Sequence, residues 1–376
     1  MSQTVQAVVQ FLQKSTKRRS ILIVFLSAVF LSSIFVSFFY FNGRTGQLND
    51  QVDAIENLSS IEIEEHEVDL SEKSTLTILL LGYGGPGHQG GYLADAIQLA
   101  HLDFERSQLT LVSIPRDLWV KLPNGSQAKI NQALTLGADK SNLIYSGGKV
   151  AKKMAEVVVG VEIDYFLAVD FVGFKRVIGE DLGSIMVDVP ETLEDKWYPI
   201  RGEELNPCGK SPEEIAKLTQ QLSGFELERQ FECRYEHIYF PKGVNKMEGG
   251  DALAYVRSRH GSAGGDFSRS QRQHALLMGV RDRLFELEFW TNLPSIYQKL
   301  SKNITTDVDL EALEYLLPVL KLMNNYEVSQ GIISTDNVLS SSKSSTGAFI
   351  LIPREGLDSW SEVRAYVQGV INPTSF

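Results

Sequence analysis

A run of twenty-two residues without a charged side chain, Ser20 to Phe41, constrains the topology of this chain more than any other feature. At about 1.5 Å per residue in a helix, such a run spans the roughly 30 Å hydrocarbon core of a bilayer. Residues 1–19 contain no acid and carry four basic side chains: Lys14, Lys17, Arg18 and Arg19. This asymmetry predicts one transmembrane helix over residues 20–41, with residues 1–19 as a cytoplasmic tail.

A cleaved signal peptide is the alternative interpretation of the same run. The run is long for the apolar region of a signal peptide, and no Ala-x-Ala cleavage site follows it. The aromatic cluster Phe38 to Phe41 is typical of the outer interface of a membrane. We therefore expect an uncleaved single-pass anchor in the cell membrane, with everything after Phe41 outside the cytoplasm.

Residues 42–74 have the composition of an acidic stalk or linker. Asn49 to Glu72 holds nine acids and no Lys or Arg, with no sustained apolar period. Such a segment cannot bury enough apolar surface to fold alone. Much of the formal net charge of -11 lies there, so the total charge says little about the remaining domain.

Residues 75–376 alternate between strand and helix patterns. Thr75 to Leu81 is an apolar strand covered on both faces, and the strands Ala96 to Asp103 and Gln108 to Ile114 flank a polar turn. Further strands are predicted over 165–171, 184–189, 237–240, 330–334 and 349–353, and helices over 149–159, 172–180, 249–258, 268–287, 294–300, 310–323 and 359–370. This order predicts a three-layer α/β/α domain with a central mixed sheet.

Within that domain we expect a core over 75–286, an irregular insert over about 191–236 and a C-terminal extension over 290–376. A serine-rich patch, Leu339 to Thr346, is predicted to be a surface loop. The insert holds both cysteines, Cys208 and Cys233. Outside the membrane this pair is compatible with a disulfide that closes a loop, whereas the spacing does not fit a zinc finger.

The stretch from Tyr255 to Gln273 concentrates four arginines and has Asp266 as its only acid. A solvated helix face would explain such a charge run, but arginine also offers a planar fork of donors that fits phosphate. Arg269, Arg272 and Gln273 stand at i, i+3 and i+4, on one helix face that continues apolar through Leu276 and Val280. The pattern therefore favours an anion site.

Two upstream residues extend this predicted site. Arg116, in the motif Ser-Ile-Pro-Arg-Asp, follows the end of a strand, where sheet proteins usually keep ligands. Asp95 opens the preceding strand and is the carboxylate near a glycine-rich loop. We expect Asp117 to pair with a neighbouring arginine. Lys129 is expected to be a surface lysine, and contact with a phosphate is the alternative.

The glycine-rich loop itself contains Gly82, Gly84 and Gly87, which satisfy the G-x-G-x-x-G spacing. A dinucleotide site needs a helix directly after this turn, whereas Pro86 and further glycines interrupt here. The loop is predicted either to bring backbone close to a ligand or to form a simple turn. His88 within it is expected to be a lone exposed histidine.

Several ordered motifs resemble the LytR-CpsA-Psr family. They are Ser113 to Asp117, Lys129 to Asn131, Gly249 to Arg259 and Asp266 to Gln273. The resemblance implies an α/β/α domain that binds a polyprenyl pyrophosphate. It implies an enzyme, a phosphotransferase that moves a glycopolymer from this lipid carrier onto the cell wall, commonly onto peptidoglycan, with Mg²⁺ as cofactor. The implied partners are therefore the lipid-linked glycan, the peptidoglycan acceptor and the membrane.

The resemblance also assigns roles by position. The pyrophosphate would be held by Arg116, Arg257, Arg259, Arg269 and Gln273, with Arg272 in support. Asp95, Arg257 and Arg259 would be the catalytic residues, and Asp95 would either bind magnesium or orient the acceptor hydroxyl.

Other interpretations stay open because this chain departs from the family pattern. Where the family has an aspartate and an arginine after the first strand, this chain has Gly84 and Pro86, and Leu93 replaces another arginine. Partial substitution by His88 is the alternative to its being a lone exposed histidine. A non-catalytic polyprenyl-pyrophosphate binding module and a lipid pyrophosphate hydrolase are the alternatives. A nucleic-acid partner is not expected, since no basic recognition helix is present.

A polyprenyl chain would need an apolar tunnel. The candidates are Phe166, Leu167, Phe171, Phe174, Leu276 and Leu277. Periodicity does not distinguish a tunnel lining from an ordinary core, and core is the default expectation.

Overall fold

The computed structural model describes residues 73–373 except 89, 123–124, 259–260, 262–264, 288–290, 292, 321 and 323–324, and excludes the side chains of 265–266 and 317–320. The predicted membrane helix and nearly all of the predicted stalk lie outside these residues. Among the helices of the described part, none is long and apolar enough to cross a membrane.

A six-stranded mixed sheet forms the centre of the domain, with the strand order β11-β6-β1-β2-β3-β12. The β1–β2, β2–β3 and β6–β11 pairs are antiparallel, whereas β1–β6 and β3–β12 are parallel. The six strands are β1 (Thr75–Tyr83), β2 (Ala94–Asp103), β3 (Gln108–Ser113), β6 (Tyr165–Asp170), β11 (Thr305–Thr306) and β12 (Glu327–Ile332). The predicted mixed sheet is confirmed.

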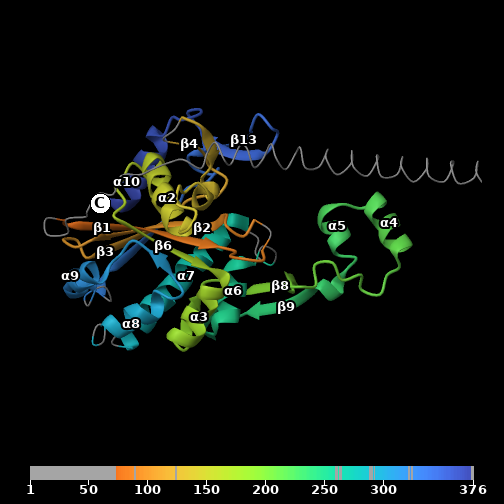
Figure 1. Ribbon diagram of the computed structural model, residues 1–376, viewed down its shortest axis with the longest axis horizontal. Helices are drawn as coiled ribbons and strands as arrows, with labels where there is room; N and C mark the ends of the chain where they lie inside the picture. Colours follow the sequence, from red (N-terminus) through yellow and green to blue (C-terminus); the bar gives the residue numbers. More distant parts are fainter. Residues whose placement is uncertain are drawn as a thin grey trace, which may run out of the picture. The chain divides into compact units, whose positions relative to one another are not determined.

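Helices cover both faces of this sheet (Figure 1). One side carries α2 (Leu143–Val159) and α10 (Ser361–Ile371). The other side carries α3 (Phe171–Arg176), α6 (Gly249–Arg257), α7 (Gly265–Glu286), α8 (Leu293–Leu300) and α9 (Leu310–Leu320). The predicted three layers are therefore present.

Strand β1 shows why the sheet needs both layers. Leu76 and its neighbours on the same face pack with Ala312 and Leu316 of α9. Successive side chains of a strand point to opposite faces, and Leu79 and Leu81, at 0% and 2% exposure, are buried on the other face. A strand that is apolar at nearly every position thus requires a cover on each side.

Smaller elements connect these layers. The pair β4 (Trp119–Lys121) and β5 (Gln127–Lys129) precedes the 3₁₀ helix η1 (Ile130–Thr135), and a π-helical turn, η2 (Val177–Asp181), extends α3. The predicted loop over the serine-rich patch is wrong. Leu339–Lys343 forms β13, which pairs with β14 (Phe349–Pro353). Leu339 is buried, whereas Ser341 and Lys343 are exposed. The strand therefore contains too few apolar residues for an alternating pattern to reveal it in the sequence.

The insert is more regular than predicted. It lies between β7 (Ile185–Val189) and β10 (Gly243–Met247), which pair with each other. Within it, β8 (Leu193–Pro199) and β9 (Tyr235–Phe240) form an antiparallel pair, and a lobe between them contains α4 (Pro212–Gln221), α5 (Gly224–Glu228) and η3 (Glu232–Arg234). None of the residues of α4 is buried.

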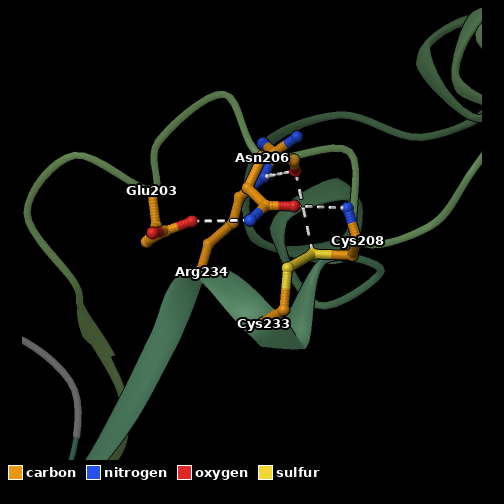
Figure 2. The surroundings of a disulfide bond; sticks show 5 residues. All are labelled: Glu203, Asn206, Cys208, Cys233 and Arg234. Atoms are coloured by element: carbon orange, nitrogen blue, oxygen red, sulfur yellow. Dashed lines mark hydrogen bonds between the residues drawn. A yellow bond between two sulfur atoms is a disulfide. The ribbon is translucent and has the colours of Figure 1, made fainter.

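The predicted disulfide is confirmed and closes this lobe. Cys208 and Cys233 are bonded, with their Cα atoms 5.7 Å apart. Figure 2 shows Asn206 beside the bond, where its side-chain oxygen accepts a hydrogen bond from the Cys208 amide at 2.8 Å. The Asn206 carbonyl accepts a second from the Arg234 guanidinium at 2.7 Å. The bond therefore joins the two chain segments that leave and return to the β8–β9 pair.

Candidate active site

The ends of four strands meet at one edge of the sheet. Tyr83, the last residue of β1, lies opposite Ala94 of β2 and Asp170 of β6. Farther along β2, Gln98 lies opposite Ser113, the last residue of β3. Asp95, three residues before Gln98, and Arg116, three residues after Ser113, therefore lie at the same edge of the sheet.

Asp95 and Arg116 form an ion pair. The Nη1 atom of Arg116 lies 2.5 Å from Oδ1 of Asp95. The Asp95 side chain is 42% exposed and that of Arg116 is 28% exposed, so both remain accessible from the cavity. Arg269 reaches the same place from α7, since its Nη2 donates to the backbone carbonyl of Asp95 at 2.8 Å. Three predicted site residues thus come together.

Helix α7 is fixed against the sheet by two polar contacts. The side chain of Gln98 donates to Oε1 of Gln273 at 2.8 Å. The next residue, His274, is fully buried, and its Nε2 lies 3.2 Å from the Ser113 hydroxyl. These contacts fix the rotation of the helix about its axis, which decides which side chains reach the cavity.

Arg269, Gln273, Leu276 and Val280 line the cavity as one stripe of α7, as the helical spacing predicted. Arg272, which the spacing placed on the same face and the resemblance placed in support, does not belong to this stripe. Arg272 is only 4% exposed and does not line the cavity. Its Nη2 donates to the Ser258 carbonyl at 2.5 Å, and burial lowers its pKa. Arg272 therefore supports the end of α6 from behind.

Arg257, the last residue of α6, is held by aromatic side chains. Its guanidinium lies 4.2 Å from the centre of the Phe171 ring, a cation–π contact, and its Nη1 donates to the Tyr198 hydroxyl at 3.4 Å. Arg257 lines the cavity. The other predicted arginine of this segment, Arg259, lies outside the described residues.

Three further polar residues, Asp117, Lys129 and Asn131, line the same cavity, and none of them was assigned to the pyrophosphate. Lys129 lies 2.6 Å from Asp117, which is also 3.7 Å from Arg116. The predicted partnership of Asp117 with an arginine is confirmed. The prediction of a surface lysine is wrong, because Lys129 is 23% exposed and lines the cavity with Asn131. The turn from β5 into η1 carries both residues beneath Arg116, whose carbonyl accepts from the Asn131 amide at 3.3 Å.

The cavity has a volume of about 860 Å³. Charged and amide side chains line it at the sheet edge, apolar side chains of β6, α3 and α7 line a second part, and Trp197, Tyr198, Tyr235 and Glu228 of the insert line a third. Five of the six candidate tunnel residues line it: Leu167, Phe171, Phe174, Leu276 and Leu277. Core was the default expectation for all six: Phe171 and Leu276 are buried and also line the cavity, whereas Phe166 is core alone. That side chain is 0% exposed and packs so closely on α2 that a Cβ at Gly148 would lie 2.2 Å from its ring.

The glycine-rich loop is a compact hydrogen-bonded turn. The Gly85 amide donates to the Gly91 carbonyl at 2.7 Å, and the Gly91 amide donates to the His88 carbonyl at 2.9 Å. Gly85 has a φ of 81°, and a Cβ there would lie 2.8 Å from the Asp170 carboxylate. The loop is thus a defined turn, and because Gly82 and Gly90 line the cavity, the alternative that it brings backbone close to a ligand stays open.

His88 is not the lone exposed side chain that was expected. It is partly buried, and its ring meets that of Phe171 edge-on at 5.2 Å. Desolvation, and then the charges of Arg201 and Arg257, lower the pKa of His88. The neutral imidazole thus packs on the same ring as Arg257.

Carboxylates near the cavity mostly serve the fold. Asp170 accepts from the Gly173 amide at 2.6 Å and caps α3. Asp195 is 1% exposed and accepts from the Ser258 hydroxyl at 2.7 Å. In the described part of the chain, no three His, Cys, Asp or Glu side chains gather in a way that could hold a metal ion. Asp95 combines exposure with proximity to the arginines.

Comparison with known families agrees with this geometry. The LytR_cpsA_psr family model matches residues 38–351. This chain belongs to the LytR-CpsA-Psr family. The match extends well beyond the arginine motifs and includes the insert.

Relatives within the family carry two kinds of name. The polyisoprenyl-teichoic acid–peptidoglycan teichoic acid transferase TagV of Bacillus subtilis is 29% identical over 266 residues, 69% of this chain and 56% of the relative. This chain therefore spans little more than half of that protein. TagU of Enterococcus faecalis, a transferase of the same description, is 23% identical over 72% of each chain. The regulatory protein MsrR of Staphylococcus aureus is 23% identical over 66% of this chain and 61% of the relative.

Crystal structures of LytR-CpsA-Psr proteins share the fold. B. subtilis TagV superposes with a TM-score of 0.52 at 24% identity, covering 80% of this chain and 98% of that chain. TagT bound to LI-WTA superposes with a TM-score of 0.50 at 21% identity, covering 83% and 95%. At these identities the comparison shows the fold alone.

Proposed function

We propose that this protein is a phosphotransferase that moves a glycopolymer from a polyprenyl-pyrophosphate carrier onto a cell-wall hydroxyl, with peptidoglycan as the acceptor. The observation that carries the proposal is the two-sided cavity, which has arginines at the sheet edge and apolar side chains beyond them. A lipid pyrophosphate has the same two-sided chemistry. The names of the transferases TagV and TagU, which specify a polyisoprenyl-linked polymer and peptidoglycan, agree with it.

The cationic end suits a pyrophosphate. Arg116, Arg257 and Arg269 all line it and come from three different segments of the chain. Each is held by a neighbour: Asp95 pairs with Arg116, its carbonyl accepts from Arg269, and Phe171 stacks on Arg257. Donors that are already oriented cost little to reorganise as charge develops on the phosphates. Binding and charge neutralisation would therefore provide most of the catalysis.

The reaction would proceed by displacement at the phosphorus that carries the glycan. An oxygen of the acceptor hydroxyl forms the new bond to this phosphorus, and the bond to the bridging oxygen breaks. The leaving group is polyprenyl phosphate, which keeps the bridging oxygen and its electron pair. Asp95 would accept the proton of the hydroxyl, since its exposed carboxylate lies beside the phosphate ligands Arg116 and Arg269.

Magnesium fits this site only with the substrate as a further ligand. Mg²⁺ is usually bound through one or two carboxylates together with substrate phosphates, so the single exposed carboxylate of Asp95 is sufficient on the protein side. A bound ion would neutralise charge on the phosphates. Asp95 would then hold the metal, while Arg116, Arg257 and Arg269 would contact the phosphates.

The missing family residues support a second candidate, a binding module that does not turn over. Gly84, Pro86 and Leu93 stand where the family pattern has an aspartate and two arginines. The compact turn that replaces this motif contributes backbone to the cavity rather than a carboxylate.

Hydrolysis of the lipid pyrophosphate, with water in place of the acceptor hydroxyl, would use the same residues.

The location of this chemistry also belongs to the proposal. A transmembrane anchor over residues 20–41 would hold the domain at the outer surface of the cell membrane, where lipid-linked polymers and peptidoglycan meet.

The test uses the full-length protein in detergent micelles. It is incubated with a polyprenyl-pyrophosphate-linked saccharide and peptidoglycan, with and without Mg²⁺. Release of polyprenyl phosphate together with attachment of saccharide to peptidoglycan supports the transferase. Release without attachment indicates the hydrolase, and lipid binding without either product indicates the binding module.

A further inference from the structure

The β8–β9 pair of the insert forms part of the cavity, although none of the family motifs includes it. Trp197, Tyr198 and Tyr235 line the cavity, as does Glu228 at the end of α5. The charged residues of the sheet edge line the same space. The insert is therefore part of the site rather than a remote decoration.

A bulge in β8 presents Trp197 to the cavity. The register between β8 and β9 shifts between Asp195 and Tyr198, which places Trp197 inside the irregular segment. Asp195 holds this segment from both sides. One of its carboxylate oxygens accepts from the Trp197 amide at 2.8 Å, and the other accepts from the Ser258 hydroxyl at 2.7 Å. Asp195 is almost fully buried, so the bulge is fixed directly to the end of α6.

Aromatic side chains then extend this wall away from the arginines. The Trp197 ring meets Phe225 at 5.7 Å and Tyr235 at 5.5 Å, both edge-on. Trp197 is only partly buried despite these contacts. On the side facing the arginines, the Tyr198 hydroxyl accepts from Arg257 at 3.4 Å. The wall thus begins at the Arg257 guanidinium and continues through the Tyr198 phenol and the Trp197 indole to the rings of Tyr235 and Phe225.

We propose that Trp197 and Tyr235, with Glu228, form a subsite for a sugar ring joined to, or about to be joined to, the phosphate held by Arg257. The inference rests on the proposed function. The C–H face of a pyranose packs on an aromatic ring, while its hydroxyls seek polar partners at the ring edge. The exposed carboxylate of Glu228, which interacts with Tyr235, is such a partner.

The neighbouring groups argue against the lipid as the occupant of this wall. The apolar residues that line the rest of the cavity, such as Leu167, Phe174 and Leu277, come from β6, α3 and α7. A polyprenyl chain can occupy that region without meeting a charge, whereas the aromatic wall carries Glu228 and two phenol hydroxyls. A ligand with a phosphate at Arg257 would therefore place its lipid on one side and its sugar on the other.

The experiment measures the affinity of the full-length protein in detergent for three probes. They are polyprenyl pyrophosphate, the same lipid pyrophosphate carrying one N-acetylhexosamine, and a soluble peptidoglycan disaccharide-peptide. The variants are Trp197→Ala, Trp197→Phe and Glu228→Gln. Tyr239→Ala is the matched control, because Tyr239 lies on the adjacent strand, is 55% exposed and does not line the cavity.

We expect the wild type to bind the sugar-bearing lipid about tenfold more tightly than the bare lipid. Trp197→Ala should remove this difference and leave the affinity for the bare lipid unchanged, Trp197→Phe should restore part of it, and Glu228→Gln should reduce it slightly. A loss confined to the disaccharide-peptide also supports the subsite and assigns it to the acceptor.

Two results would overturn the inference, and each has a separate meaning. If the wild type binds both lipids equally and no variant changes the affinity for any probe, the aromatic wall is not a sugar subsite although the proposed function stands. If the wild type binds neither lipid, the proposed function fails and the subsite fails with it. Because Glu228 is exposed, Glu228→Gln keeps the test informative even if Trp197→Ala does not fold.

Discussion

The cavity has two walls that are built by different means. The sheet wall consists of Asp95, Arg116, Arg269 and Gln273, and the hairpin wall consists of Trp197, Tyr198 and Tyr235. Strand register and the contacts between α7 and the sheet fix the first wall. The second wall continues into a lobe whose helix α4 buries no residue and which a disulfide closes.

Under the proposed function, this difference would separate two tasks. Charges that act on a phosphate need fixed positions, so they lie on elements that the buried core holds in place. Recognition of a particular saccharide can reside on an insert, which tolerates changes that the sheet does not. Arg257 stands between the walls, since it stacks on Phe171 of the domain core and bonds to Tyr198 of the hairpin.

Replacing Arg257 by alanine should have the largest effect, because both walls lose their common cation. We expect transfer to fall about 1,000-fold, at the upper end of what one preorganised donor contributes, with a parallel loss of lipid affinity. Arg281→Ala, on a part of α7 that does not line the cavity, is the matched control. Unchanged activity of Arg257→Ala would mean that the phosphate site lies elsewhere.

Asp95→Asn isolates the chemistry of the sheet wall. The amide has the same shape but can neither accept a proton nor neutralise a metal ion, so transfer should fall about 100-fold. Lipid affinity should stay nearly constant, because Arg257 and Arg269 remain. Asp282→Asn, at a half-exposed position, serves as the control. If lipid affinity falls as far as the rate, Asp95 acts only by orienting Arg116.

Removing the disulfide should affect the hairpin wall alone. In the chain-entropy view, a bond that closes a loop of this length, with a sequence separation of 25, stabilises it by about 3 kcal/mol. For Cys208→Ser/Cys233→Ser we expect faster proteolysis within the lobe and about a tenfold loss in affinity for the sugar-bearing lipid. Equal losses for the bare lipid would show that the two walls are not independent.

Acid should weaken the support of the sheet wall, with the smallest effect of the four. Burial lowers the pKa of His274, which follows Gln273 on α7 and contacts the Ser113 hydroxyl, so the folded protein favours the neutral imidazole. Its contribution to stability is therefore complete above the unfolded pKa of about 6.5 and is lost as the pH falls through the lower folded value. Melting temperatures between pH 7.5 and 5 should decline, and His274→Gln should flatten the decline. A slope that His274→Gln leaves unaltered would contradict this account.

The sequence by itself predicted much of this protein. Apolar periodicity identified the main strands and helices and the mixed sheet, because burial imposes a period on any chain. The cysteine pair was also visible. Helical spacing, a local property, placed Arg269 and Gln273 on one face, although it placed Arg272 there as well.

Only the tertiary structure decided which of these side chains share the cavity. Phe166 and Leu167 are neighbours on β6, yet a strand sends them to opposite faces, so one is core and the other lines the cavity. Arg272 differs from Arg269 in the same way, because the contacts that fix α7 turn it towards Ser258. Asp95 and Arg116 meet because of strand register. Asp195 of β8 joins the hairpin to Ser258, the residue that follows Arg257. Each of these outcomes depends on pairing between distant segments, which no local pattern specifies.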